Sequence, residues 1–495
     1  MTDRREFLKA SGLAAAGAAL APGALAADRG RRIPYRMFWS WDHSTNWCEN
    51  VPGSQNFGIS SPYTKRTAER WFEKDYRRVI DWCAAHDMQA VGITALLRDV
   101  HGGVDAARRL CGYAREKGVR VYVIGGLYAY GGAYYEGESP WSLDRFFERN
   151  PDAIARGKDG KPYYARFMSH GGAKVEAQGC PSNAKLRDYI VESYDWLFRT
   201  IPELGGIQME AGDNGVCQCP ACKERRGQKA ASEYMSLEDM AGIYPRMVDA
   251  VRARAKDALV ICETYHHFLD PACGIFYEKE PGADAKALFA MPKDVFWQWK
   301  CDRVLDTGEW TEGAPLPDPL RGFNHVMRSH AGTQWWRGRG AFDVEKIRLQ
   351  CRLSALSGLN GVSMFGEVSP YHANAEFNYL ALQYFADAPL APLADFVSDV
   401  MAPRLGGENP AARWLEWARL ENQPEKIAAA TDEIAKLVGG VKDKEARRRW
   451  LYLAARLESF RWEWERNGHV LPNYSFRARP ESGAAADPSK PDHME

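Results

Sequence analysis

The sequence lacks an excess of charge of either sign. Among its 495 residues, 65 Lys and Arg balance 65 Asp and Glu, so the formal net charge is zero. A protein that holds a nucleic-acid backbone or a membrane surface needs a basic or amphipathic stretch, and none stands out in this sequence. We therefore expect no nucleic-acid partner and no membrane insertion.

Signatures of common cofactors and of disulfide-rich domains are also missing. No G-x-G-x-x-G follows the first expected strand, no phosphate-binding P-loop occurs, and no internal repeat is visible. The 11 cysteines are odd in number and mostly scattered, which argues against a disulfide framework. We expect that catalysis requires no cofactor. Aromatic residues are abundant instead, and flat rings suit the C–H faces of sugars.

The two ends of the chain do not resemble folded protein. Arg4 and Arg5 precede a weakly apolar run over residues 10–20, far shorter than the about 20 apolar residues of a membrane-spanning helix. Small residues at 24–26 offer a signal-peptidase site. Residues 1–27 are therefore predicted to be a twin-arginine (Tat) signal, with the Tat export machinery as partner and a periplasmic or secreted location. Residues 471–495, rich in Pro, Ala and charge, are predicted to be a disordered tail.

Between these ends, strand and helix patterns alternate. Short apolar or aromatic runs bounded by turn residues predict eight strands, at residues 35–41, 90–93, 119–124, 206–209, 258–262, 294–299, 323–327 and 361–365. Helical apolar spacing follows most of them, at residues 69–86, 104–117, 184–199, 233–256 and 343–356. Eight such units predict a (β/α)₈ TIM barrel over residues 33–390, with an open doubly wound sheet as the alternative. Further helical patterns at 411–420, 424–437 and 444–467 predict a helical C-terminal region over residues 391–470.

Polar and aromatic residues follow the predicted strands. In a barrel, the carboxyl ends of the strands meet on one face, where (β/α)₈ enzymes place their active sites. Three carboxylates come at strand ends, Glu210, Glu263 and Glu367, and Asp213 follows Glu210 closely. The other candidates at this face are expected to bind substrate: Asp42, His43, Asn46, Tyr128, Tyr265, His266, Trp297, Trp299, Arg328, His330 and Tyr371.

This set of residues predicts hydrolysis of glycosidic bonds in an oligo- or polysaccharide. One carboxyl group protonates the leaving oxygen, and a second attacks the anomeric carbon or activates water. Each acid alone is also compatible with a helix cap or a local ion pair. Trp297 and Trp299 share one face of a strand, and each alone is more typical of a core than of a sugar-binding platform. The alternatives are a non-catalytic carbohydrate-binding barrel and a Tat-exported metalloenzyme or oxidoreductase.

A cysteine cluster lies just beyond Glu210. Cys217, Cys219 and Cys222 follow the pattern C-x-C-x-x-C, which brings three sulfurs close together. Cys180 or a nearby His is a candidate fourth ligand, which would complete a tetrahedral structural zinc site. A disulfide within this group, or inert thiols, are the alternatives. An all-thiolate zinc site is closed, so it would fix the loop behind Glu210 without taking part in catalysis.

Several of these features resemble a known group of enzymes. The expected barrel, the turn Cys180-Pro-Ser-Asn183 and the acid at the end of the fourth strand resemble (β/α)₈ glycoside hydrolases of the β-hexosaminidase and α-glucuronidase kind. The stretch from Glu210 to Cys222 is similar to bacterial proteins grouped with them. The resemblance spans roughly residues 35–390.

The resemblance implies roles for particular residues. It makes Glu210 the general acid. Hexosaminidases set Asp and Glu side by side at this strand end, whereas Glu210 and Asp213 are three residues apart. We therefore expect the second carboxylate to be Glu263 or Glu367, with Asp213 assisting. The similarity of the helical C-terminus to that of α-glucuronidases implies that Arg328 or a His meets a substrate carboxylate.

Overall fold

The computed structural model describes residues 29–41, 47, 69–169, 172–210, 216–226, 235–268, 286–307, 316, 318–332 and 341–468. Several predictions fall on other residues and lie outside this description. They are the signal peptide over residues 1–27, the tail over residues 471–495, and the candidate site residues Asp42, His43, Asn46 and Asp213.

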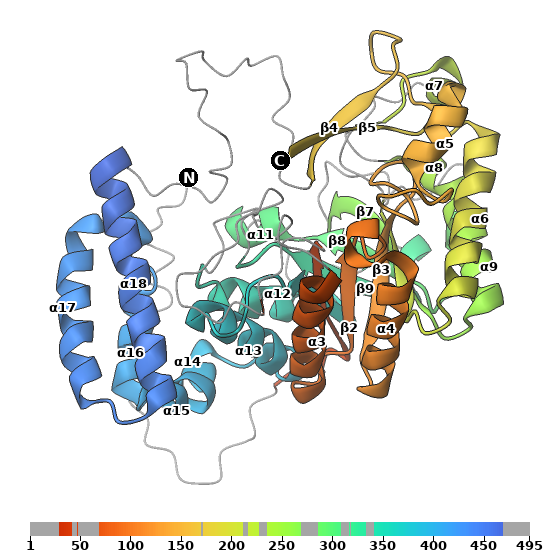
Figure 1. Cartoon of the computed structure of the whole chain (residues 1–495). Coiled ribbons are helices and arrows are strands. Elements are labelled where there is room, and N and C mark those ends of the chain that lie inside the picture. The colour runs from red at the N-terminus through yellow and green to blue at the C-terminus, as the bar shows by residue number, and fades with distance from the viewer. Residues whose placement is uncertain are drawn as a thin grey trace.

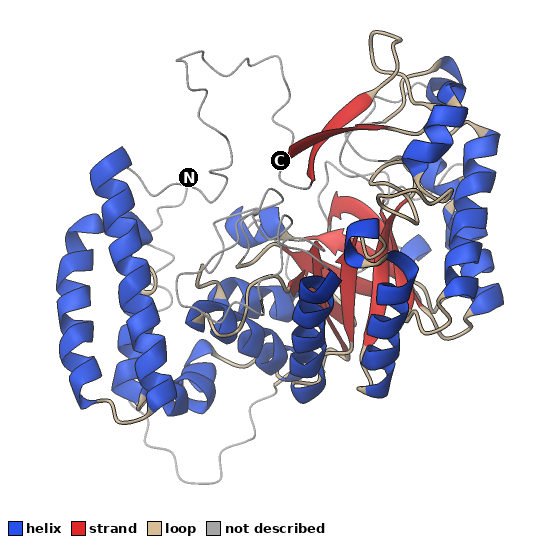
Figure 2. Ribbon diagram, in the orientation of Figure 1, coloured by secondary structure: helices blue, strands red, loops and turns tan. Residues whose placement is uncertain are grey.

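Eight parallel strands close into a barrel, which confirms the predicted (β/α)₈ fold (Figures 1 and 2). Around the barrel the order is β1-β10-β9-β8-β7-β6-β3-β2. Each strand overlaps its predicted range: β1 (Tyr35–Trp41), β2 (Ala90–Thr94), β3 (Arg120–Gly126), β6 (Gly206–Glu210), β7 (Leu259–His267), β8 (Phe296–Lys300), β9 (Asn324–Ser329) and β10 (Gly361–Phe365).

Helices cover the outside of the barrel, as Figure 2 shows. Asn183 starts α6, because its side chain accepts a hydrogen bond from the backbone N–H of Leu186. The helix predicted over residues 233–256 is instead two helices, and Pro245 stands in the first turn of the second, where the missing N–H of proline does no harm. The covering helices are α3 (Glu69–Ala85), α4 (Gly103–Glu116), α6 (Ala184–Thr200), α8 (Leu237–Ala241), α9 (Tyr244–Arg254), α12 (Val344–Leu356) and α13 (Ala373–Asp387).

The two faces of the barrel strands bury different side chains. One set packs outward against the helices, and it includes Phe38, Val260 and Trp297. A second, smaller set fills the barrel interior, and it includes Trp39 and Ile261. Neighbouring residues of a strand point to opposite faces, so this division fixes the direction of every other strand residue. The polar residues that continue the inner set at the carboxyl ends of the strands therefore point into the barrel mouth.

An insert between β3 and α6 builds a second layer over the barrel mouth. The sequence predicted an irregular segment here, but the insert contains α5 (Leu143–Arg149) and an antiparallel hairpin, β4 (Tyr164–Ser169) and β5 (Gly172–Ala177). In Figure 1 the hairpin lies above the barrel, on the same side as α5 and α7 (Pro220–Arg225). The two strands are joined by two residues, because Ser169 pairs with Gly172 in the antiparallel register.

Short helices complete the connections near the barrel. They are α10 (Lys286–Phe289), α11 (Asp302–Thr307) and the 3₁₀ turns η1 (Asp99–His101), η2 (Pro151–Ala153) and η4 (Asp318–Leu320). Of these, α11 matters for the site, because it begins directly after β8 and brings its first residue to the barrel mouth.

The C-terminal residues form a helical group beside the barrel, at the left in Figure 1. Trp414 of α16 (Glu408–Trp417) and Trp450 of α18 (Lys444–Asn467) meet edge to face, with ring centroids 5.0 Å apart, and belong to the same apolar cluster as the outer layer of the barrel. Among the described helices, none is long and apolar enough to cross a membrane. The elements are α14 (Leu393–Phe396), η5 (Val397–Met401), α15 (Ala402–Leu405), α16 (Glu408–Trp417), η6 (Leu420–Asn422), α17 (Pro424–Gly440) and α18 (Lys444–Asn467).

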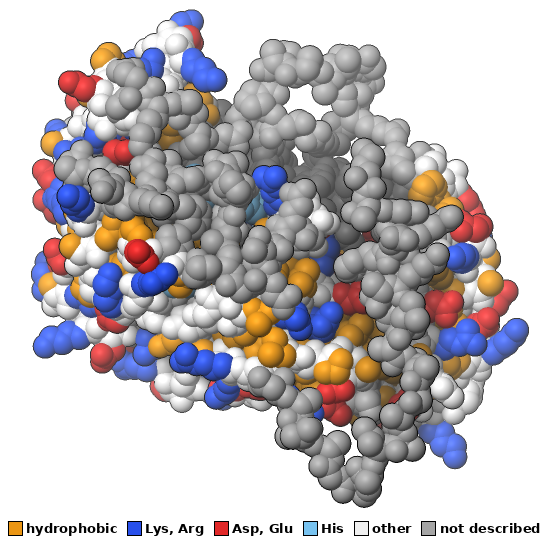
Figure 3. Space-filling model, turned by 180° about the vertical axis from the view of Figure 1, so that it is seen from behind, with side chains coloured by type: hydrophobic (Ala, Val, Ile, Leu, Met, Phe, Trp, Pro, Cys, Tyr) orange, Lys and Arg blue, Asp and Glu red, His pale blue; other side chains and the backbone are white. Residues whose placement is uncertain are grey.

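On the face of the molecule shown in Figure 3, acidic and basic side chains of the described residues are interspersed. No broad area of one sign is visible among them. This distribution agrees with the formal net charge of zero.

Candidate functional site

Glu210 and Glu263 occupy neighbouring positions on adjacent strands at the barrel mouth. In the parallel ladder between β6 and β7, Gln208 pairs with Ile261 and Met209 pairs with Cys262. Glu210 and Glu263 are the next residues in register, on strands that are about 4.8 Å apart. Because Ile261 belongs to the interior set, the two acids also point into the barrel. Both are buried, with 7% and 0% of their surface exposed.

Hydrogen-bond donors from three strands surround the Glu263 carboxylate. Its Oε1 accepts the backbone N–H of Tyr265 at 3.0 Å. Its Oε2 accepts the side-chain amides of Gln208, at 3.2 Å, and of Gln298. The guanidinium Nε of Arg328 lies 3.7 Å from the same oxygen. Every partner is a donor, so the group is arranged to act as a carboxylate.

Buried polar atoms without partners surround this network. Among the described residues, no hydrogen bond reaches Trp39 Nε1, Gln208 Oε1, Gln298 Oε1 or Arg328 Nη2. These atoms come from β1, β6, β8 and β9. An unsatisfied buried polar atom costs about 1–3 kcal/mol, so four of them in one place indicate a site whose partners are supplied by water or a ligand.

Arg328 and His330 occupy the end of β9. Burial is the largest influence on Arg328 and opposes its charge, but the neighbouring acidic groups, Glu263 first among them, together outweigh burial and raise the pKa of this guanidinium. The guanidinium carbon lies 4.3 Å from the centroid of the Trp39 ring, a cation–π contact. His330 Nε2 lies 3.4 Å from Arg328 Nη1. The two residues predicted from the sequence are thus in contact with each other.

An aspartate that the sequence did not reveal holds His330 in place. Asp302, the first residue of α11, accepts hydrogen bonds from the backbone N–H and from Nδ1 of His330, both at 2.7 Å. Burial opposes the ionisation of Asp302, yet the attraction of His330 and its hydrogen bonds prevail and lower the pKa of the carboxyl group. Burial lowers the pKa of His330. The pair fixes the imidazole against Trp39, whose ring centroid is 5.5 Å away.

Glu210 faces a small cavity beneath the insert. The cavity has a volume of about 20 Å³, room for about one water molecule. Tyr128, Gln178 and Met235 line it together with Glu210 and Cys217. The structure therefore places Tyr128, a predicted substrate-binding residue, beside this acid.

Glu367 lies across the mouth, three strands from β7. It is buried, and its Oε1 accepts the backbone N–H of Trp41 at 3.4 Å. The Trp41 ring meets Tyr130 and Tyr135 edge to face, with centroids 5.9 and 6.0 Å away. Three aromatic residues thus cluster on this side of the mouth, next to Glu367.

Strained backbone is concentrated at the barrel mouth. Four described residues other than glycine have a positive φ, and three of them follow or end barrel strands: Ala95 (60°), Tyr130 (53°) and Tyr265 (58°). Such conformations cost about 1–3 kcal/mol each and collect at functional sites. At Tyr265, the strand register with β8 shifts between Glu263 and His267, and the Glu263 carboxylate holds the strained amide.

The prediction that Trp297 and Trp299 bind substrate is wrong. Both rings are fully buried in the core between the sheet and the helices. The indole N–H of Trp299 donates to His325 Nδ1 at 3.0 Å, on the outer side of the barrel. The period-two spacing was correct, but the inner face of β8 carries Gln298 and Lys300 instead. His266 is also buried, and its backbone N–H donates to Thr264 Oγ1 at 3.1 Å.

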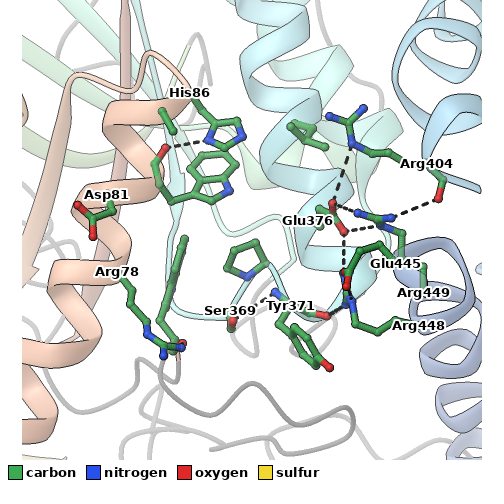
Figure 4. Close-up of a pocket in the computed structure, with 15 residues that line it drawn as sticks. Arg78, Asp81, His86, Ser369, Tyr371, Glu376, Arg404, Glu445, Arg448 and Arg449 are labelled. Carbon is green, nitrogen blue, oxygen red and sulfur yellow. Dashed lines mark hydrogen bonds and ion pairs between the residues drawn. The ribbon is translucent and has the colours of Figure 1, made fainter. Parts of the chain in front are cut away.

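Tyr371 lies in a different pocket, shown in Figure 4, on the side of the barrel. This side pocket has a volume of about 560 Å³ and lies between α3, the segment after β10, α13 and α18. The Arg448 guanidinium lies 4.3 Å from the centroid of the Tyr371 ring. Arg449 donates two hydrogen bonds, of 2.6 and 2.8 Å, to the carboxylate of Glu376. Ion pairs thus join the barrel to the C-terminal helices here.

Cys180, Cys217, Cys219 and Cys222 come together beside the Glu210 cavity. Their sulfur atoms all lie within 4.8 Å of one another, and all four are free thiols. Of the described His, Cys, Asp and Glu residues, this is the one group of three or more placed to hold a metal ion. The four ligand candidates are those predicted from the sequence.

Comparison with known proteins gives a structural likeness only. No protein-family model and no curated protein matches the chain. A GH138 enzyme targeting pectin rhamnogalacturonan II is similar over 87% of this chain and 57% of its own, at 11% identity and a TM-score of 0.49. The cyclic α-maltosyl-(1→6)-maltose hydrolase of Arthrobacter globiformis is similar over 71% and 82%, at 14% identity and a TM-score of 0.41. The chain thus spans just over half of the first, and these values assign it no activity.

Proposed function

We propose that the chain is a glycoside hydrolase that cleaves an oligo- or polysaccharide with two carboxylates, Glu210 and Glu263. The observation that supports this most is their place in the β6–β7 register, one step beyond Met209 and Cys262, with both side chains directed into the barrel mouth. Two carboxyl groups on facing sides of a scissile bond are what glycosidic hydrolysis requires.

The surroundings of the two acids favour different roles. Glu210 borders a cavity with Tyr128 and Met235 and is the proposed proton donor to the leaving oxygen. Glu263, held by donors only, is the proposed nucleophile. Neighbouring strands about 4.8 Å apart favour the separation of about 5–5.5 Å of retaining enzymes over the about 6.5–9.5 Å of inverting ones. Glu263 then attacks the anomeric carbon as the C–O bond breaks, and water, deprotonated by Glu210, cleaves the glycosyl ester.

The remaining mouth residues suit a sugar ligand. The partly exposed ring of Trp41 offers a flat face for C–H groups, and the buried rings of Tyr130 and Tyr135 support it from the sides. The unpartnered atoms of Trp39, Gln208, Gln298 and Arg328 offer donors and acceptors for hydroxyl groups. Arg328 is also a candidate partner for a substrate carboxylate. A Tat signal over residues 1–27 would place this activity outside the cytoplasm.

A second candidate is a carbohydrate-binding barrel without catalysis. The observation that favours it is that both oxygens of Glu263 already accept hydrogen bonds and one faces Arg328. In this case the site would bind a saccharide and turn nothing over.

Substituting each acid separates these functions. The purified protein is assayed on polysaccharides and on aryl glycosides with good leaving groups. Glu210→Gln should lower turnover of natural substrates by about 10²–10⁴-fold, because protonation of the leaving group is lost, and should spare substrates whose leaving group needs no proton. Glu263→Gln should abolish turnover of both kinds. The product anomer, followed by NMR, reports retention.

The control addresses stability. Glu263→Gln leaves Arg328 as an unpaired buried charge, which costs about 3–5 kcal/mol. Adding Arg328→Met should restore much of the stability and none of the activity. Saccharide binding without turnover by the unaltered protein would establish the second candidate. Full activity of both Gln variants would overturn the proposed function.

A further inference from the structure

The four clustered thiols have the arrangement of a tetrahedral metal site. The sulfur of Cys180 lies 3.7 Å from that of Cys219 and 3.6 Å from that of Cys222. Four thiolates bound to Zn²⁺ at about 2.3 Å stand about 3.8 Å from one another, which follows from tetrahedral geometry. The observed separations therefore match the edges of a ZnS₄ tetrahedron.

The sulfurs come from two distant parts of the chain. Cys180 belongs to the turn before α6, whereas the other three precede or begin α7. Three of the four are buried, and Cys219 is partly exposed. Four sulfurs that lie close to one another supply the four ligands of one tetrahedral metal ion. Two disulfides would instead draw the sulfurs into two pairs at about 2.05 Å, and nothing in the geometry selects such pairs.

Donors around the cluster are placed to stabilise thiolates. The backbone N–H of Arg156 points to Cys217 Sγ at 3.3 Å. Cys222 Sγ lies 3.0 Å from the Ser182 hydroxyl and 3.7 Å from Arg225 Nη2. Arg225 is itself tied to Ser182, at 2.6 Å, and to Asp239. Such a supporting layer orients metal ligands and offsets the negative charge that four thiolates carry around one Zn²⁺.

We propose that Cys180, Cys217, Cys219 and Cys222 bind one structural Zn²⁺. All four positions are protein thiolates, so the site is closed and offers no place for a substrate. The ion joins the turn before α6 to the segment after β6. Cys217 and Glu210 line the same cavity, so the ion also fixes one wall of the space that Glu210 faces. The zinc site does not depend on the proposed hydrolase function.

Metal content tests the proposal directly. The full chain, purified without metal-affinity steps, should contain one zinc per chain by elemental analysis. Cys219→Ser and Cys222→Ser should lower this to well below one. Cys111→Ala, which removes a buried thiol of α4, should leave it unchanged and is the matched control. Because Cys219 is the most exposed of the four, its variant is the least affected in folding.

Cobalt substitution gives a second readout that does not require a variant. Protein refolded or expressed with Co²⁺ should show the strong thiolate-to-cobalt charge-transfer absorption of a tetrahedral S₄ site. A metal-free protein with all thiols titratable would overturn the proposal. A protein mass that is lower by four hydrogen atoms, which indicates two disulfides, would also overturn it. A coloured iron–thiolate site in place of zinc would do the same. None of these outcomes bears on turnover, so the test remains separate from that of the hydrolase.

Discussion

Two glutamates paired with arginine, Glu263 (buried) and Glu376 (partly buried), differ in how many hydrogen-bonding groups around them have no partner. Glu376 of α13 is gripped by Arg449 through two hydrogen bonds and approached by Arg448 at 3.4 Å. Glu263 in the barrel has one arginine, Arg328, in a single contact at 3.7 Å, and otherwise neutral donors. The charge of Glu376 is thus fully countered by cations, whereas that of Glu263 is held mainly by amides.

The partners of the two glutamates differ as well. Around Glu263, the amide oxygens of Gln208 and Gln298 and the Nη2 of Arg328 have no partner among the described residues. The arginines at Glu376 use their remaining groups on backbone carbonyls, those of Arg404 and Tyr371. A saturated network stabilises the contact between barrel and helices, while an incomplete one is suited to a ligand. The difference shows that a buried ion pair alone does not identify an active site, and that the unused hydrogen-bonding groups around it must be compared as well.

The largest expected effect on stability comes from breaking the saturated network. Glu376→Gln leaves two nearly buried arginines facing a neutral amide, so the free energy of unfolding should fall by about 3–5 kcal/mol. Denaturant titration measures it. Glu445→Gln is the matched control, because Glu445 contacts the same Arg448 at 2.8 Å from an exposed position. Its loss should cost at most about 1 kcal/mol.

The same variant sharpens the comparison with Glu263. Assayed well below its unfolding transition, Glu376→Gln should keep the activity of the unaltered protein, because none of its partners lies at the barrel mouth. Loss of activity in the folded variant would show that the two networks are coupled and would remove the distinction drawn between them.

A third buried group, on the outer side of β9, belongs to neither network and gives a pH dependence. Burial lowers the pKa of His325 from 6.5 to about 4. In the unfolded chain His325 therefore becomes protonated below about pH 6.5, whereas in the folded protein it becomes protonated only near pH 4. Stability is thus fully present above pH 6.5 and is lost as the pH falls toward 4, by about 3 kcal/mol in total.

Replacing His325 checks this sign and size. The side-chain amide of His325→Gln can still accept from the Trp299 indole and donate to the Leu320 carbonyl, the two partners of the imidazole. The variant should show a flatter fall in unfolding free energy between pH 6.5 and 4. Some slope should remain, because burial also lowers the pKa of His86 and of His330. An unchanged slope would contradict the assignment to His325.

Much of this architecture could be predicted from the sequence because it rests on local pattern. Apolar runs gave all eight strands, and the pattern at residues 444–467 gave α18 with its observed bounds. The location of Glu210 and Glu263 at the barrel mouth could also be predicted, because the carboxyl ends of all barrel strands lie on one face. Cys180 could be assigned to the C-x-C-x-x-C motif because a tetrahedral metal site needs four ligands and the motif supplies only three.

The rest depends on information that local pattern does not contain. Period two showed that Trp297 and Trp299 share a face, but both faces of a barrel strand are apolar, so the pattern could not say which face is the interior. Had the inner face been known, Gln298 and Lys300 would have followed. Asp302 begins a short helix, and only the tertiary fold brings it to His330, 28 residues later.

The smallest expected effect concerns Tyr371, which the sequence placed with the substrate and the structure places against Arg448. Tyr371→Leu removes the ring beneath the guanidinium and should lower the free energy of unfolding by about 0.5–1 kcal/mol, the size of a cation–π contact near the surface. Tyr371→Phe keeps the ring and should change nothing. Both variants should retain KM and kcat, because neither Glu210 nor Glu263 is among the described residues that line the side pocket. A raised KM in Tyr371→Leu alone would instead show that the side pocket is part of the path by which the substrate reaches the carboxylates.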